Sequence, residues 1–144
     1  GSAIAWQPTE RAGGGYTLEV ESHLFPKDGH AEGFGVIFGG HDLDADTQRY
    51  YYFLINKDGQ FLINHRAGTA VHPLTPWTAS AAVVRPDRED ARNILTVQAT
   101  PDSLAFAING TRVHAMARPA DADGLVGLRV NHGISVHVTR VTVR

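Results

Sequence analysis

The segment from Tyr50 to Arg66, which reads YYYFLINKDGQFLINHR, constrains the fold more than any other part of the chain. Two apolar runs flank Asn56-Lys57-Asp58-Gly59, and Asn, Asp and Gly are the residues that tight hairpin turns favour. If Gly59 takes the left-handed conformation that ends a three-residue loop, Ile55 pairs with Phe61. A two-residue turn at the Asp-Gly pair is the competing arrangement, and it would pair the strands in a different register.

Side chains alternate across a strand, so this hairpin has two distinct faces. One face has the composition of a protein core and consists of Tyr51, Phe53, Ile55, Phe61, Ile63 and His65. The other face consists of Tyr50, Tyr52, Leu54, Leu62, Asn64 and Arg66. Because it combines aromatic rings with an amide and a guanidinium, this second face is typical of a sugar-binding surface.

The remaining chain continues the pattern of short strands separated by turn residues. Such strands are predicted at residues 16–23, 33–38, 71–77, 93–100, 104–115, 125–130 and 134–143. Asn109-Gly110 predicts a second hairpin that pairs Phe106 with Val113. A change of alternation near Thr139-Arg140 predicts a β-bulge. About ten strands with no sustained helical period indicate an all-β fold, an antiparallel sandwich or barrel.

Length and composition narrow the possible functions. The 144 residues predict one domain at residues 16–144, preceded by an N-terminal lead-in segment at residues 1–15 whose Gly1-Ser2 resembles a tag remnant. The net charge of -2 argues against a nucleic-acid partner or an anionic membrane surface. No apolar run is long enough to span a bilayer. The absence of Cys excludes disulfides, thiolate metal sites and Cys nucleophiles.

Several short motifs occur in an order that is informative when they are taken together. They are Tyr16-Thr17-Leu18-Glu19-Val20, Gly35-Val36-Ile37-Phe38, Tyr50-Tyr51-Tyr52-Phe53 with Asp58-Gly59, Trp77, Asn93-Ile94-Leu95-Thr96-Val97, Ile108-Asn109-Gly110 and Gly124-Leu125-Val126-Gly127-Leu128. This order resembles the concanavalin A-like lectin/glucanase superfamily, a two-sheet jelly roll. Within it, the chain is most similar to the small laminin-G-like sandwiches and to the 3-keto-disaccharide hydrolase domain family.

The resemblance implies two curved antiparallel sheets with ligands on the concave sheet or at its rim. It also implies a secreted or periplasmic parent protein. The chain departs from the glucanase branch, because the Glu-x-Asp-x-x-Glu run of those enzymes is absent and Glu19-Val20-Glu21 is the nearest approach. One fold hosts many functions, so the resemblance predicts the fold more strongly than an activity.

Glu19 and Glu21 are the candidate catalytic pair. On one strand face their Cα atoms lie about 6.8 Å apart, and glycoside hydrolysis needs two carboxylates about 5–9.5 Å apart. The alternative is an exposed face whose acids keep the protein soluble. The enzyme hypothesis places His23 and Arg66 near the pair.

A possible metal site lies in the loop before the hairpin. Asp42, Asp44 and Asp46 alternate there, and carboxylates at such spacing can converge on Ca²⁺. The loop lacks the Gly and the bidentate Glu of a calcium-binding loop, so a solvated acidic loop is the alternative. The eight His residues are dispersed and show no metal-binding spacing.

The predicted ligand-binding residues are Tyr50, Tyr52, Asn64, Arg66 and Trp77. Aromatic faces stack on the C–H faces of a sugar ring, while an amide and a guanidinium bind its hydroxyls. The sequence thus favours a non-catalytic carbohydrate-binding module that needs no cofactor, unless Ca²⁺ occupies the acidic loop. A glycoside hydrolase is one alternative. A protein-contact domain, whose sheet face is filled by its own side chains, is the other.

Overall fold

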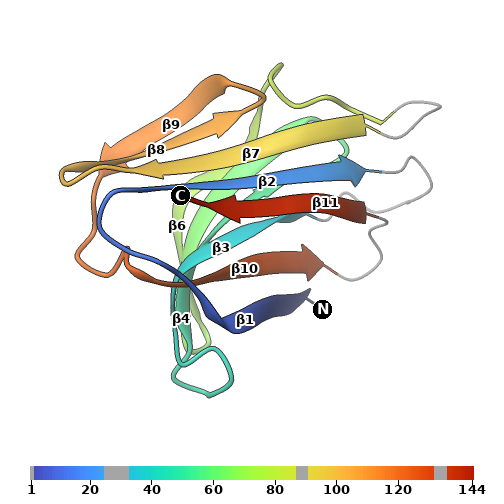
Figure 1. Cartoon of the computed structure of the whole chain (residues 1–144). Helices are drawn as coiled ribbons and strands as arrows, with labels where there is room; N and C mark the ends of the chain where they lie inside the picture. The colour runs from blue at the N-terminus through green and yellow to red at the C-terminus, as the bar shows by residue number, and fades with distance from the viewer. Residues whose placement is uncertain (1, 25–32, 87–90, 132–135) are drawn as a thin grey trace.

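The computed structural model describes residues 2–24, 33–86, 91–131 and 136–144 (Figure 1). These residues form eleven strands and no helix, so no helix of the described chain is long and apolar enough to cross a membrane. The strands are β1 (Ser2–Ala12), β2 (Tyr16–Leu24), β3 (Phe34–His41), β4 (Arg49–Ile55), β5 (Gln60–Ala67), β6 (Ala70–Ala79), β7 (Ala91–Ala99), β8 (Ser103–Ile108), β9 (Thr111–Ala117), β10 (Gly124–Asn131) and β11 (Val136–Val143).

The strands form two antiparallel sheets that pack face to face. Sheet A has six strands in the order β1-β10-β3-β4-β5-β6, and sheet B has five in the order β11-β2-β7-β8-β9. In Figure 1, β8, β7, β2 and β11 lie in the layer above β10 and β1. The predicted all-β, two-sheet antiparallel sandwich is therefore confirmed.

The core lies between the two sheets and is built by alternation. On β2, the buried side chains Leu18 and Val20 alternate with the partly exposed Glu19 and Glu21. Phe53 of sheet A meets Phe106 of sheet B edge to face, with ring centroids 5.3 Å apart. Each fully buried large apolar side chain contributes about 1.5–3 kcal/mol, so this interior dominates the stability of the sandwich.

The β4–β5 hairpin has the first of the two predicted registers. Ile55 lies opposite Phe61, and Gly59 has a φ of 80°, the left-handed conformation that the three-residue loop requires. The backbone N–H of Asn56 donates to the carbonyl of Gln60 at 3.0 Å and closes the loop. The face that was predicted to be core points into the space between the sheets.

Outside this hairpin, some predicted details are confirmed and some are corrected. β6 is an edge strand, as Pro73 and Pro76 suggested. The register of β11 on β2 shifts between Val138 and Arg140, where the bulge was expected. In the β8–β9 hairpin, however, a bulge next to Ala107 pairs Phe106 with His114 instead of Val113.

The N-terminal segment also differs from its prediction. Residues 2–12, expected to be a lead-in, form the edge strand β1, which pairs with β10 from Ser2 opposite Asn131 to Ala12 opposite Gly124. The register shifts between Trp6 and Arg11. The sequence of β1 lacks clean apolar alternation because an edge strand with an irregular register does not present one uniform face to the core.

Candidate functional site

The candidate site is the outer face of sheet A, the face that points away from sheet B. Register places one side chain per strand in rows across this face. The central row consists of Trp6, Gly127, Ile37, Tyr52, Asn64 and Pro73. The row beside it consists of Ile4, Arg129, Gly35, Leu54 and Leu62. The predicted binding residues Tyr52 and Asn64 are thus direct neighbours.

A network of polar groups joins the middle of this face. The guanidinium carbon of Arg129 lies 4.0 Å from the centroid of the Tyr52 ring, a cation–π contact. The same guanidinium donates to the hydroxyl of Tyr50 at 3.1 Å. The amide of Asn64 donates to the hydroxyl of Tyr52 at 3.0 Å. The structure therefore brings Tyr50, Tyr52 and Asn64 together as predicted, and it adds Arg129, which sequence reasoning missed.

The side chains of Tyr50 and Tyr52 lie on the predicted face of the hairpin, but they are buried. Tyr50 is 1% exposed and Tyr52 is 3% exposed. Arg129 already occupies the face of the Tyr52 ring that was expected to stack on a sugar. The centre of the outer face is therefore filled by its own side chains. The two tyrosines do not form the exposed stacking surface that the sequence predicted.

Two members of the predicted set lie farther out on the face. Arg66 is half-buried, and its Nε donates to the carbonyl of Gly68 at 2.9 Å, which fixes it beside the turn into β6. Trp77 of β6 is 38% exposed. A Cβ added at Gly33 would lie 2.8 Å from Cη2 of Trp77, so the indole rests against the backbone there. Trp77 is thus a partly exposed aromatic ring that packs against the backbone of Gly33.

The side-chain oxygen of Asn64 is buried, and it accepts no hydrogen bond from the residues that the structure describes. An unpaired buried acceptor costs about 1–3 kcal/mol. A donor that reached Asn64 would recover that free energy, although a neighbouring side chain must first move because the atom is covered.

The candidate catalytic pair lies on a different face of the molecule. Glu19 and Glu21 project from β2 on the outside of sheet B, across the core from the outer face of sheet A. Glu21 forms an ion pair with Arg92 at 2.9 Å and lies 4.0 Å from His23. The expected neighbour His23 is therefore present. Arg66 belongs to the other sheet, which corrects its expected place beside the pair.

Glu19 also has an arginine partner. Its carboxylate lies 3.7 Å from the guanidinium of Arg144. Exposed ion pairs of this kind contribute about 0–1 kcal/mol. The geometry around both acids is that of a charged surface. A catalytic role for the pair stays a prediction.

The acidic loop does not gather its carboxylates. Asp42 accepts a hydrogen bond from the hydroxyl of Thr47 at 3.3 Å. Asp42, Asp44 and Asp46 form no metal-binding group, and no set of three or more His, Asp or Glu side chains in the described chain does so. A calcium site in this loop stays a prediction.

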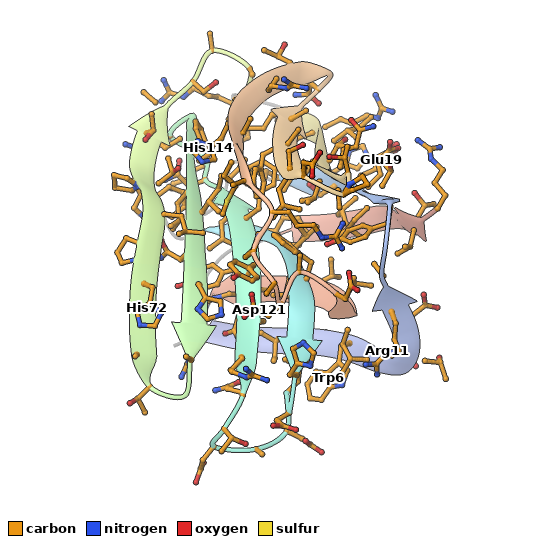
Figure 2. All side chains as sticks on the ribbon, turned by 90° about the vertical axis from the view of Figure 1, so that its left-hand side faces the viewer. Trp6, Arg11, Glu19, His72, His114 and Asp121 are labelled. Carbon is orange, nitrogen blue, oxygen red and sulfur yellow. The ribbon has the colours of Figure 1, made fainter. Side chains whose placement is uncertain are left out.

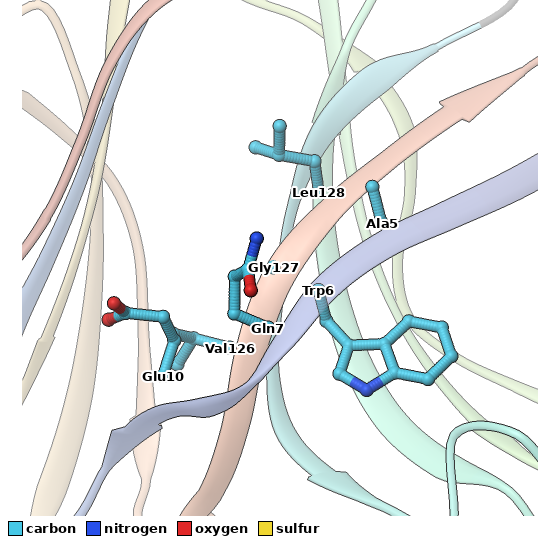
Figure 3. A pocket seen from close by; sticks show the side chains of 7 residues that line it. All are labelled: Ala5, Trp6, Gln7, Glu10, Val126, Gly127 and Leu128. Carbon is cyan, nitrogen blue, oxygen red and sulfur yellow. The ribbon is translucent and has the colours of Figure 1, made fainter.

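A cavity that the sequence did not indicate lies between β1 and β10 (Figure 3). Its volume is about 340 Å³, and it is lined by Ala5, Trp6, Gln7, Glu10, Val126, Gly127 and Leu128. The cavity adjoins the part of β1 where the register shifts. Figure 3 shows the Gln7 and Glu10 side chains on the opposite side of β1 from the Trp6 indole.

Comparison with solved structures shows the same architecture in several proteins. The carbohydrate-binding module CBM66 from Bacillus subtilis superposes with a TM-score of 0.78 at 14% identity, covering 99% of this chain and 81% of that one. A Bacillus subtilis protein of unknown function with a galectin-like fold gives a TM-score of 0.72 at 12% identity, covering 99% and 76%. Sheep galectin-11, in complex with glycerol, gives 0.66 at 12% identity, covering 99% and 95%.

The chain has a galectin-like β-sandwich. No family model and no curated protein sequence matches it. At these low identities the structural likeness establishes the fold, in agreement with the predicted concanavalin A-like jelly roll. The narrower resemblances to laminin-G-like sandwiches and to 3-keto-disaccharide hydrolases stay predictions.

Proposed function

We propose that the chain is a non-catalytic carbohydrate-binding β-sandwich module that binds its ligand on the outer face of sheet A. The observation that carries the proposal is Trp77, an exposed indole that lies against Gly33 on the outer face of sheet A. The superposed proteins include one named as a carbohydrate-binding module and one named as a galectin, which supports the same reading.

The binding mechanism follows from the chemistry of this face. A sugar ring stacks its apolar C–H side on the Trp77 indole, while polar groups beside the indole bind its hydroxyls. Arg66, which is held by its hydrogen bond to Gly68, lies opposite Val71 toward the other end of β6 from Trp77, so it can bind only a part of the ligand that extends along the strand. The buried tyrosines then act as the support that orients Arg129 rather than as the stacking surface.

The test is a glycan array followed by calorimetric titration of any saccharide that binds. We expect Trp77→Ala to weaken binding about tenfold or more, because an aromatic contact contributes about 0.5–1.5 kcal/mol in addition to the burial of its apolar surface. Leu74→Ala is the matched control, since Leu74 lies on the same strand and is 37% exposed. Failure to bind any saccharide, or equal affinity of Trp77→Ala and wild type, would overturn the proposal.

A protein-contact domain is the second candidate, and β6 gives it a specific observation. Val71, Leu74 and Trp77 are 48%, 37% and 38% exposed on this edge strand, and the middle of the outer face is filled. Exposed apolar side chains grouped on one element mark interaction surfaces. In that case Leu74→Ala and Trp77→Ala would weaken binding of a protein partner equally, while no saccharide would compete.

The glycoside hydrolase alternative makes a separate prediction. It needs Glu19 and Glu21, which lie outside sheet B and pair with arginines. Turnover of a 3-keto-disaccharide that is lost in Glu21→Gln would support it, and absence of turnover on any such substrate would contradict it. As to location, we propose a secreted or periplasmic parent protein, where glycans are accessible.

A further inference from the structure

Two histidines face each other on the neighbouring strands β5 and β6, at one edge of sheet A. His65 of β5 lies directly opposite His72 of β6, and their Nδ1 atoms are 3.3 Å apart. The ring centroids are 5.5 Å apart and the ring planes differ by 14°. Because the centroid separation exceeds the nitrogen separation, the rings meet edge to edge with both Nδ1 atoms turned toward each other. Figure 2 views the side that carries His72.

The carboxylate of Asp121 lies near the second ring nitrogen of His65. Nε2 of His65 lies 3.7 Å from one oxygen of Asp121, whose other oxygen accepts a hydrogen bond from the Tyr51 hydroxyl at 2.6 Å. The Tyr51 and His65 rings are in contact, with centroids 4.4 Å apart. At 3.7 Å the carboxylate is too far from Nε2 for a hydrogen bond, and this buried nitrogen has no hydrogen-bond partner among the described residues. Asp121 therefore supplies a negative charge beside the imidazole and does not orient the ring through a hydrogen bond.

We propose that His65 and His72 bind a transition-metal dication, such as Zn²⁺, Ni²⁺ or Cu²⁺, through their Nδ1 atoms. This site lies on the inward-pointing side of sheet A and is independent of the proposed carbohydrate face. Two bonds of about 2.05 Å that span the observed 3.3 Å enclose an angle of about 107°, close to the tetrahedral value, and the rings must tilt so that both Nδ1 lone pairs aim at the ion. Water completes the coordination from the solvent side, where His72 is exposed.

The charges around the pair are compatible with a bound cation. Asp121 lies 3.7 Å from Nε2 of His65, and the neutral form of an imidazole is the form that binds metal. Asp121 offers a negative charge against the positive charge of Arg49. Without metal, one Nδ1 donates a hydrogen bond to the other, so a metal ion would take the place of a single proton.

The proposed site predicts how metal affinity changes in a set of variants. We expect wild type to bind one Zn²⁺ or Ni²⁺ at this site in calorimetry, with a rise in thermal midpoint that EDTA reverses. His72→Gln should weaken this binding at least tenfold without unfolding the protein, because His72 is exposed. Asp121→Asn should weaken it about tenfold by removing the negative charge that lies 3.7 Å from His65.

His114→Gln is the matched control. His114 lies on β9, with its Nδ1 3.5 Å from the hydroxyl of Thr75 on β6, and it should bind metal as wild type does. With Cu²⁺, electron paramagnetic resonance should show coupling to two nitrogens in wild type and His114→Gln, and to one in His72→Gln. Unchanged affinity in His72→Gln, equal loss in His114→Gln, or no binding in wild type would mean that the pair only shares a hydrogen bond.

Discussion

At the scale of single residues, Arg129 determines what the outer face of sheet A presents to solvent. Its guanidinium covers the Tyr52 ring at 4.0 Å and donates to the Tyr50 hydroxyl. A cation on an aromatic face contributes about 0.5–2 kcal/mol, more where water is excluded. This contact removes two phenol rings from the surface and leaves Trp77 as the exposed aromatic ring of the predicted binding set.

The hydrogen bond between Asn64 and Tyr52 gives a prediction at this scale. Tyr52→Phe should lower the free energy of unfolding by about 1–2 kcal/mol, because the buried Asn64 amide loses the acceptor it contacts at 3.0 Å. Urea denaturation measures the change. The double variant Tyr52→Phe/Asn64→Leu should recover part of the loss, since it removes both polar partners. A single variant as stable as wild type would show that the bond contributes nothing.

At the scale of one element, the β4–β5 hairpin is held by the side chain of Asn56. This residue is 1% exposed, and its Oδ1 accepts hydrogen bonds from the backbone N–H of Asp58 at 3.1 Å and of Gln60 at 3.0 Å. Its amide donates to the Gln60 side chain at 2.9 Å. The turn is therefore specified by one residue that satisfies several polar groups at once.

Removal of that side chain tests the hairpin directly. Asn56→Ala should lower the free energy of unfolding by about 1–3 kcal/mol, because two backbone donors lose their acceptor in a partly buried turn. Asp58→Ala is the matched control, since Asp58 is exposed in the same turn and should change stability by less than about 0.5 kcal/mol. Denaturant midpoints compare the two variants. Equal effects would indicate that the turn is specified by the backbone and Gly59 alone.

The sequence predicted best those strand pairings that are determined by a short turn between the two strands. The register of β4 on β5 follows from a turn a few residues long, and so does the pairing of Ile108 with Thr111 across Asn109-Gly110. The bulge at Ala107 carries no Gly or Pro signal, so nothing nearby marks it. The pairing of β1 with β10 joins segments that lie far apart in the sequence, and no local pattern encodes such a contact.

The candidate site was partly predictable for the same reason. Alternation alone placed Tyr52 and Asn64 on one face of the hairpin, and register confirmed it. Arg129 comes from β10, which joins that face only through β3, where Gly35 lies opposite it. The burial of the tyrosines depends on this distant strand, so it could not be read from the hairpin. The His65–His72 pair likewise required the register of β6, which shifts next to Ile63.

At the scale of the whole molecule, the loop between β9 and β10 ties the two sheets together. The Tyr16 hydroxyl of sheet B donates to the carbonyl of Ala122 at 3.0 Å, and the Tyr51 hydroxyl of sheet A donates to Asp121 at 2.6 Å. Arg118 donates to the carbonyl of Thr100 at 2.9 Å and forms an ion pair with Asp123. The sandwich is therefore closed at this end by two phenols that must keep their protons.

This closure predicts how stability changes in alkaline solution. Burial raises the pKa of Tyr16 to about 12, against the lowering effect of Arg118. Burial and the hydrogen bond to Asp121 also raise the pKa of Tyr51. In the unfolded chain both phenols ionise near pH 10. Between about pH 10 and 12 the folded state thus holds more protons, and the stabilisation that is complete below pH 10 is lost as the pH rises.

Tyr16→Phe separates this effect from general alkaline damage. The variant should be about 1 kcal/mol less stable than wild type at pH 7, because it lacks the hydrogen bond to Ala122. Between about pH 10 and 12 it should lose less stability than wild type, because one titrating phenol is gone. Urea midpoints at each pH measure both quantities, and Trp77→Phe, which removes no ionisable group, should keep the wild-type profile. Parallel pH profiles for Tyr16→Phe and wild type would show that this phenol does not couple ionisation to folding.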